Sequence, residues 1–335
     1  MNRVMIRAKP LAGVDGQRAQ ARTIARCGLP PASLPHLEKS LKKQWKRYRK
    51  ELRRCQEKFS ENAIHDSRVQ TRRLLSIVEL LGGFIPTVCV EKIESALKEH
   101  LDTFDDLRDT QVQLPMVRKL ARTFVAGRPF CDYLVEREER FSRQTRKQIK
   151  QVKTGRVGKL IAAAREDVQE KGKRCSPERA SAILLRSLDR AFARAVQLRA
   201  RIDPSDTRTI HCTRVAFKKF RYMVEALADY LPAANDRMLA AMHHYQTMMG
   251  NIQDAEVLLR TWDKFIEKRE LPPDQARRLR EELVRRRQWL IKIYLHAAGQ
   301  LTQFWPLSMD RDGAAAAPAA RTRSLAKPKS NGGRR

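Results

Sequence analysis

The sequence has little of what secreted proteins and membrane proteins depend on. Only six of its 335 residues are cysteine, and no two of them form a Cys-x-x-Cys pair. This scarcity argues against a disulfide framework and against a zinc ribbon, and it fits a reducing compartment. No run approaches the ~18 uninterrupted apolar residues of a membrane helix, and no short apolar segment of the secretory type follows the N-terminus. We expect a cytoplasmic protein without a membrane span.

Signatures of catalysis and of cofactor binding are also missing. Residues 155–160 contain glycines but lack the spacing and the Ser or Thr of a phosphate-binding loop. His243 and His244 are adjacent, so on a helix they diverge by about 100°, and no set of carboxylates or cysteines completes a metal site around them. No Ser/His/Asp or Cys/His arrangement is recognisable. We therefore expect no enzymatic activity, no metal and no cofactor.

Acidic residues are scarce relative to basic ones. The chain has 69 Lys and Arg against 38 Asp and Glu, which gives a formal net charge of +31. Such an excess repels itself in the compact state and attracts polyanions. The expected partner is therefore nucleic acid, an anionic membrane surface or a phosphate polymer rather than an ordinary small-molecule substrate.

Strand patterns are absent, and good helix formers fill the middle of the chain. Aromatic residues make up 6% of the sequence, while Leu, Ala, Glu, Lys, Arg and Gln dominate residues 33–305. Glycines and prolines interrupt this stretch at intervals typical of helix ends. The pattern predicts an all-α protein. Residues 1–32 and 306–335 are rich in Gly, Pro, Ala and basic residues, and we expect them to be a disordered basic arm and tail.

One helical pattern occurs twice. The segment IHDSRVQTRRLLSIVELLGGFIP covers residues 64–86, and IHCTRVAFKKFRYMVEALADYLP covers residues 210–232. A second pair of motifs, LRDTQV at 107–112 and IQDAEV at 252–257, follows at nearly the same offset. Two matched motifs in the same order indicate an internal duplication.

The duplication predicts the domain organisation. We expect two pseudo-symmetric antiparallel helical bundles of about four helices each. The first would cover residues 33–154 and the second residues 177–305, with a connection at 155–176.

Each copy of the repeated helix carries a narrow polar stripe. At 100° per residue, one His and two cations fall on the same face, opposite a wide apolar face. Cations at i and i+4 repel by roughly a few tenths of a kcal/mol. The stripe therefore lowers the stability of the fold unless an anion bridges its charges. Reversing those charges should leave the stability of the free protein unchanged or raise it slightly. A solvated basic face is the alternative interpretation. The stripes and their flanking cations are His65, Arg68, Arg72 and Arg73 in the first copy, and His211, Arg214, Lys218 and Lys219 in the second.

The first helix of each half is basic as well. Lys39, Lys43 and Arg47 recur at four-residue spacing, and so do Arg186, Arg190 and Arg194. These residues are either the walls of a cationic cleft or an exposed face that charge keeps soluble.

The repeated pattern resembles a known family. His-x-x-Arg-Val-x-x-(Arg/Lys)-(Arg/Lys), followed by an apolar run and Glu, is similar to the motif of the CHAD family of histidine-bearing α-helical domains. Residues 218–225 resemble its K-x-x-R-Y-x-x-E pattern, and residues 250–254 resemble its L-G-x-x-x-D turn. The resemblance covers residues 33–305. It implies two helical bundles that bind inorganic polyphosphate through basic residues lining the space between them.

The resemblance also implies which residues face the ligand, although the two halves differ. Leu75 stands where the second copy has Arg221, Gln253 replaces the counterpart of Arg108, and Asp105 occupies the position of Gly250. The polyphosphate-binding residues implied are His65, Arg68, Arg72, Arg73, His211, Arg214, Lys218, Lys219 and Arg221, with Lys39, Lys43, Arg47, Arg108, Arg186, Arg190 and Tyr222 as further candidates.

The sequence thus favours a non-enzymatic protein that binds polyphosphate, and it suggests association with polyphosphate granules. Nucleic acid, held through the basic arm and tail, is the alternative partner. An accessory role or enzymatic activity in polyphosphate processing is the second alternative. The basic stripes contain few aromatic residues for base stacking, and no DNA-reading motif is recognisable. Oligomeric state leaves no signal in the sequence.

Overall fold

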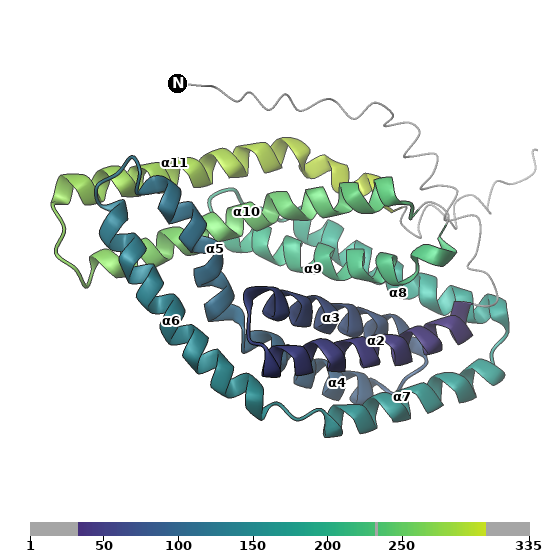
Figure 1. Ribbon diagram of the computed structural model, residues 1–335. Helices are drawn as coiled ribbons and strands as arrows, with labels where there is room; N and C mark the ends of the chain where they lie inside the picture. The colour runs from purple at the N-terminus through teal and green to yellow at the C-terminus, as the bar shows by residue number, and fades with distance from the viewer. Residues whose placement is uncertain (1–32, 232–233, 306–335) are drawn as a thin grey trace, which may run out of the picture.

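Helices are the only regular elements in the described part of the chain, residues 33–231 and 234–305 of a computed structural model (Figure 1). The all-α prediction is confirmed. The predicted disordered arm and tail, residues 1–32 and 306–335, lie outside the described residues. The α-helices are α2 (Ser33–Glu57), α3 (Glu61–Leu80), α4 (Thr87–Asp102), α5 (Asp105–Leu120), α6 (Gly127–Gln151), α7 (Gly155–Lys173), α8 (Pro177–Arg199), α9 (Thr207–Ala226), α10 (Asp236–Ile266) and α11 (Pro273–Ala297), with short 3₁₀ helices η1 (Leu81–Gly83), η2 (Ala228–Tyr230) and η3 (Ala298–Gln303).

The helix order of the first half returns in the second half. Helices α3 and α9 begin and end at positions that are 146 residues apart, and so do α6 and α11. Helix α2 corresponds to α8, and α4 with α5 corresponds to the single helix α10. The additional helix α7 packs on α2 and α4 and leads from one half to the other.

The two repeated helices, α3 and α9, pack against each other at the centre of the molecule. Helix α2 covers α3, and α8 covers α9 in the equivalent place. One large core runs through both halves, and a smaller one joins α5 and α6 to α10 and α11 around Phe130 and Trp262. Because the halves share these cores, the polar stripes of α3 and α9 are held at fixed positions beside each other.

Each repeated helix has a local reason to start where it does. The Ser60 hydroxyl accepts a hydrogen bond from the Ala63 backbone N–H (3.3 Å), and the Asp206 carboxylate accepts one from the Arg208 backbone N–H (3.0 Å). Such caps satisfy N–H groups that have no partner inside the helix. The apolar faces predicted for both helices are buried, with Leu74 and Phe217 fully covered.

A break between α4 and α5 distinguishes the first half. The Arg68 guanidinium donates to the Leu101 carbonyl (2.9 Å) and to the Asp105 carboxylate (2.8 Å), so it binds the end of α4 and the start of α5 together. In the second half Gly250 replaces Asp105, and α10 continues without a break. None of the described helices combines the length and the apolar character that crossing a bilayer requires.

Candidate functional site

Four cations from the two repeated helices meet between α3 and α9, and we call them the central cluster: Arg68, Arg72, Arg214 and Lys218. The pKa of Lys218 is lowered to about 7, first by burial and then by the charges of Arg72, Arg214 and Arg68. Burial also lowers the pKa of Arg72 to about 10, helped by Arg68 and Arg214. These mutual effects place both predicted stripes at one site, where they form a desolvated concentration of positive charge.

Three carboxylates lie beside the central cluster but neutralise it only in part. Asp105 forms an ion pair with Arg68. The pKa of Asp109 is raised to about 6, first by burial and then by the neighbouring carboxylates of Asp105 and Asp254. Burial also raises the pKa of Asp254, against the opposing charge of Arg214.

The remaining three cations of the central cluster, Arg72, Arg214 and Lys218, make no ion pair with any described residue. A cation held in this state has its desolvation cost uncompensated. An anion entering the cluster would supply the missing partner.

Two buried polar atoms near the cluster have no hydrogen-bond partner among the described residues: Arg214 Nε and His211 Nδ1. The Arg214 guanidinium lies against α10 at Gly250, where an added Cβ would be 3.4 Å from Nε. Burial lowers the pKa of His211, and the charges of Arg214 and Lys218 lower it further. His65, its counterpart in the first copy, is exposed on α3. The unpartnered Arg214 N–H suits a ligand rich in acceptor oxygens, and His211, whose ring also bonds Gln253, would donate from Nδ1 when protonated.

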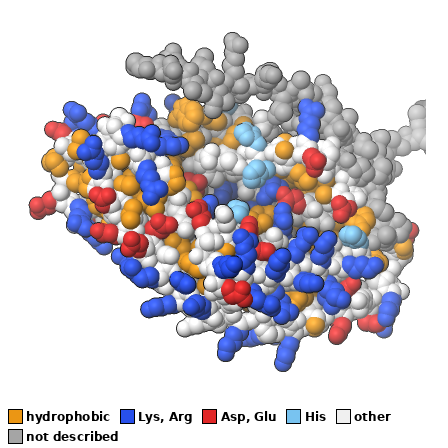
Figure 2. All heavy atoms as spheres, in the orientation of Figure 1, with side chains coloured by type: hydrophobic (Ala, Val, Ile, Leu, Met, Phe, Trp, Pro, Cys, Tyr) orange, Lys and Arg blue, Asp and Glu red, His pale blue; other side chains and the backbone are white. Residues whose placement is uncertain are grey.

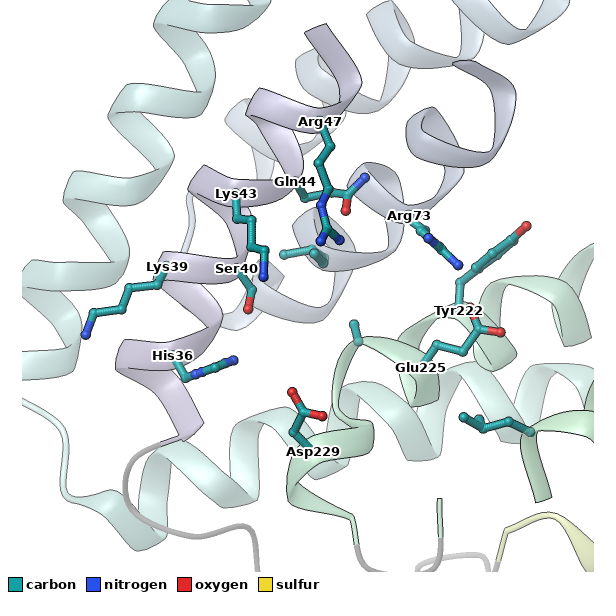
Figure 3. Close-up of a pocket in the computed structure, with 13 residues that line it drawn as sticks. His36, Lys39, Ser40, Lys43, Gln44, Arg47, Arg73, Tyr222, Glu225 and Asp229 are labelled. Carbon is teal, nitrogen blue, oxygen red and sulfur yellow. The ribbon is translucent and has the colours of Figure 1, made fainter. Parts of the chain in front are cut away.

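A cavity of about 530 Å³ opens beside the cluster between α2, α3 and α9, and we call it the α2 pocket (Figure 3). Lys43 and Arg47 point into it from α2, and Arg73 reaches toward Tyr222 from the opposite side, whereas Lys39 points away. Tyr222 also influences the pKa of Arg72 and of Arg214, so the pocket adjoins the central cluster. The lining residues are His36, Lys39, Ser40, Lys43, Gln44, Arg47, Arg73, Ile77, Tyr222, Glu225, Ala226, Asp229 and Leu239.

An equivalent cavity of about 380 Å³ lies between α8, α9, α3 and α4, and we call it the α8 pocket. Arg190 and Arg194 of α8 line it, together with Lys219. The Lys219 ammonium is paired with the Glu79 carboxylate at 2.8 Å. The predicted flanking cations Arg73 and Lys219 therefore point into different pockets and not into the central cluster.

The remaining candidate residues from the sequence lie outside the central cluster, the α2 pocket and the α8 pocket. Arg221 is buried, where it donates to Gln246 and to Glu225 and packs over the Tyr222 ring. Arg108 is bonded to Glu61 at the start of α3 (2.9 Å). Arg186 is exposed on α8, and its carbonyl accepts from the Arg190 side chain.

Sequence reasoning missed several residues of the α2 pocket, although a signal was present. The series Ser40, Lys43 and Arg47 on α2 returns as Ser187, Arg190 and Arg194 on α8. Both series line a pocket, so the spacing could have identified Ser40 and Ser187. His36 and Gln44 enter the α2 pocket through tertiary packing and leave no comparable pattern, whereas Glu225 is the glutamate that ends the repeated motif.

The wider surface is basic around these sites. Lys and Arg side chains gather on the lower half of the face in Figure 2, over α2 and α7. No group of three or more His, Cys, Asp or Glu in the described ranges is placed to hold a metal ion. The arrangement offers many hydrogen-bond donors and a high positive charge, and both favour the binding of phosphate oxygens.

Comparisons with known proteins show a similar fold. The crystal structure of the CHAD domain from the plant Ricinus communis is similar, with a TM-score of 0.56 and 19% identity over 81% of this chain and 92% of that one. PptA from Streptomyces chartreusis is similar too, with a TM-score of 0.58 and 16% identity over 83% of this chain and 100% of that one. No curated protein matches the sequence. The profile of the CHAD domain matches residues 36–263, which is more than half of the chain, and the chain therefore belongs to the CHAD domain family.

Proposed function

We propose that this protein binds inorganic polyphosphate in the central cluster and the adjoining α2 pocket, without chemical transformation of the polymer. The observation that carries the proposal is the meeting of Arg72, Arg214 and Lys218, from both repeated helices, without an ion-pair partner among the described residues. A polymer with one negative charge at every internal phosphate supplies what three converging cations lack. The association of the CHAD family with polyphosphate supports the same ligand.

The mechanism is charge neutralisation combined with directed hydrogen bonds. Arg72 and Arg214 present planar, paired donors that match two phosphate oxygens, while Lys218 acts as a point charge. These groups are already desolvated and held by packing, so little ordering is needed when the ligand arrives. A long chain could continue from the cluster past Tyr222 to Arg73, Lys43 and Arg47. Recruitment to polyphosphate granules would follow from this affinity.

A charge-neutralising double variant tests the proposal. Arg72→Gln with Lys218→Gln removes two of the unpaired cations and leaves the Arg68 contacts intact. Charged hydrogen bonds are worth about 1.5 kcal/mol or more each, so affinity for long-chain polyphosphate at pH 6.5 should fall by at least about 100-fold. The matched control is Arg122→Gln with Arg128→Gln, which changes the net charge equally at two exposed positions, in the turn after α5 and at the start of α6, and should bind nearly like the parent.

The rival functions are separated by the same titration. Duplex DNA and RNA are offered as competitors at fixed salt, and phosphate release is followed with and without magnesium. Equal binding by the cluster variant and the control variant would refute the proposed site. Tighter binding of nucleic acid than of polyphosphate would replace the proposed ligand, and sustained phosphate release would show an enzyme.

A further inference from the structure

The α2 pocket and the α8 pocket are counterparts in the two halves, and their residues can be compared one by one. Ser40, Lys43 and Arg47 on α2 correspond to Ser187, Arg190 and Arg194 on α8. Each pocket also has a cation from its own half's repeated helix, Arg73 or Lys219. Each receives a glutamate from the repeated helix of the other half: Glu225 in the α2 pocket and Glu79 in the α8 pocket.

The two glutamates nevertheless pair differently. In the α8 pocket, Glu79 crosses from α3 to the Lys219 ammonium of α9 at 2.8 Å. The equivalent contact in the α2 pocket would join Glu225 of α9 to Arg73 of α3, and no such ion pair forms. The Glu225 carboxylate is bonded instead to Arg221, one turn earlier on its own helix.

One sequence difference accounts for this. Arg221 corresponds to Leu75 in the first copy, so Glu79 has no guanidinium one turn earlier and turns to Lys219. Arg221 is 6% exposed, and it is fixed from two further sides by Gln246 (2.9 Å) and by the ring of Tyr222 (4.4 Å to the ring centre). It therefore holds Glu225 rigidly in its own pair.

We propose that Arg221 is a positioning residue that keeps Glu225 away from Arg73, so that the α2 pocket stays open to phosphate while Glu79 closes the α8 pocket by occupying Lys219. The inference rests on the proposed function and adds the path of the bound polymer: a polyphosphate chain leaves the central cluster on the α2 side only. The Glu79 carboxylate takes the place that a phosphate would have in the α8 pocket. Arg221 contributes to affinity through Glu225, without touching the ligand.

Arg221→Leu, which copies the first half, tests the positioning role. The released Glu225 should pair with Arg73, and polyphosphate affinity should fall by about three- to tenfold, the range expected for one partly exposed charged contact. Adding Glu225→Gln to Arg221→Leu should restore the parental affinity, because the competing carboxylate is gone. A purely structural role of Arg221 would give no such rescue.

Glu79→Gln tests the closed pocket from the other side. It frees Lys219 and should tighten binding by about three- to tenfold, whereas Glu91→Gln, an equal change of charge on an exposed part of α4, should have much less effect. If Arg221→Leu does not fold, Glu79→Gln against Glu91→Gln decides the question. Unchanged affinity in a folded Arg221→Leu variant, absence of rescue by Glu225→Gln, or equal effects of Glu79→Gln and Glu91→Gln would each overturn the inference.

The proposed function fails in a different way. If neutralising Arg72 and Lys218 leaves polyphosphate binding intact, the central cluster is not the site, and the proposal of the preceding section falls. If that double variant loses affinity while the Arg221 and Glu79 variants behave like their controls, the cluster stands and only the one-sided path is wrong.

Discussion

Polyphosphate affinity should decrease as the pH rises above about 7, because of Lys218. Its ammonium is largely buried and faces Arg72, Arg214 and Arg68, the charge of Asp105 acts in opposition, and its pKa is lowered to about 7. At pH 8.5 the free protein therefore holds Lys218 mainly in the neutral form. A phosphate beside it favours the charged form and raises its pKa, so binding takes up a proton.

The size of the effect follows from proton linkage. When binding takes up one full proton, affinity falls tenfold per pH unit, which is about 1.4 kcal/mol. Between pH 7.5 and 8.5 we therefore expect a loss of up to about tenfold. Internal phosphates of a long chain stay ionised over this range, so the polymer itself adds little. His211, whose pKa is lowered from 6.5, and Asp109, whose pKa is about 6, titrate below this window and strengthen binding further toward pH 6.

Calorimetry in two buffers of different ionisation enthalpy counts the protons taken up, and fluorescence anisotropy gives the affinity at each pH. The control is Lys218→Arg, because a guanidinium keeps its charge throughout this range. Its affinity should be nearly independent of pH between 7.5 and 8.5. Equal pH dependence in the parent and in a folded Lys218→Arg variant would refute the assignment of the proton to Lys218.

The remaining predictions concern stability and the extent of the site. Arg68→Ala should lower the free energy of unfolding by about 1–3 kcal/mol in chemical denaturation, because the part-buried Leu101 carbonyl loses its donor and Asp105 loses its ion-pair partner; an unchanged midpoint would contradict this. Lys218→Met should stabilise the free protein more at pH 6 than at pH 9. The free-energy cost of burying the charged ammonium is complete below the folded pKa of about 7, and it is lost as the pH rises toward the unfolded pKa of 10.5. Equal shifts in melting temperature at the two pH values would argue against this prediction. The logarithm of affinity should fall linearly with the logarithm of salt concentration, with a slope of roughly −3 for four phosphate contacts, and a flat response would exclude an electrostatic mechanism. Removal of residues 1–32 and 306–335 should leave cooperative unfolding unchanged and weaken binding only modestly, and loss of all binding would place the main site in the termini.

Several properties of this protein could be predicted from its sequence because they depend on neighbours within a few turns. Glycine and proline mark most helix ends, and the period of apolar residues fixes the buried face of each helix. The repeated stripe identified Arg72, Arg214 and Lys218 because residues three and four apart share one face. The repeat also predicted that the two halves would be built alike, and the returning helix order agrees with it.

Tertiary structure decided which of these cations are unpaired. Arg68 and Arg214 have the same place in the motif, yet among the described residues only Arg68 forms an ion pair, with Asp105. This contact stabilises a helix break at which the sequence has no glycine or proline. The stripe's repulsion alone predicted that removing Arg68 would be tolerated. The structure adds contacts of Arg68 with residues more than 30 positions away, and from these we expect a loss of stability instead.

Likewise, Arg73 and Lys219 are equivalent in the sequence, but within the described ranges only Lys219 is paired with a carboxylate, Glu79. Ion pairs form between groups that the fold brings within a few ångströms, whatever their separation along the chain, and a periodic pattern carries no information about them. The sequence therefore determined the helices and the charge that each presents. Packing of α3 against α9 determined which of those charges are left for a ligand.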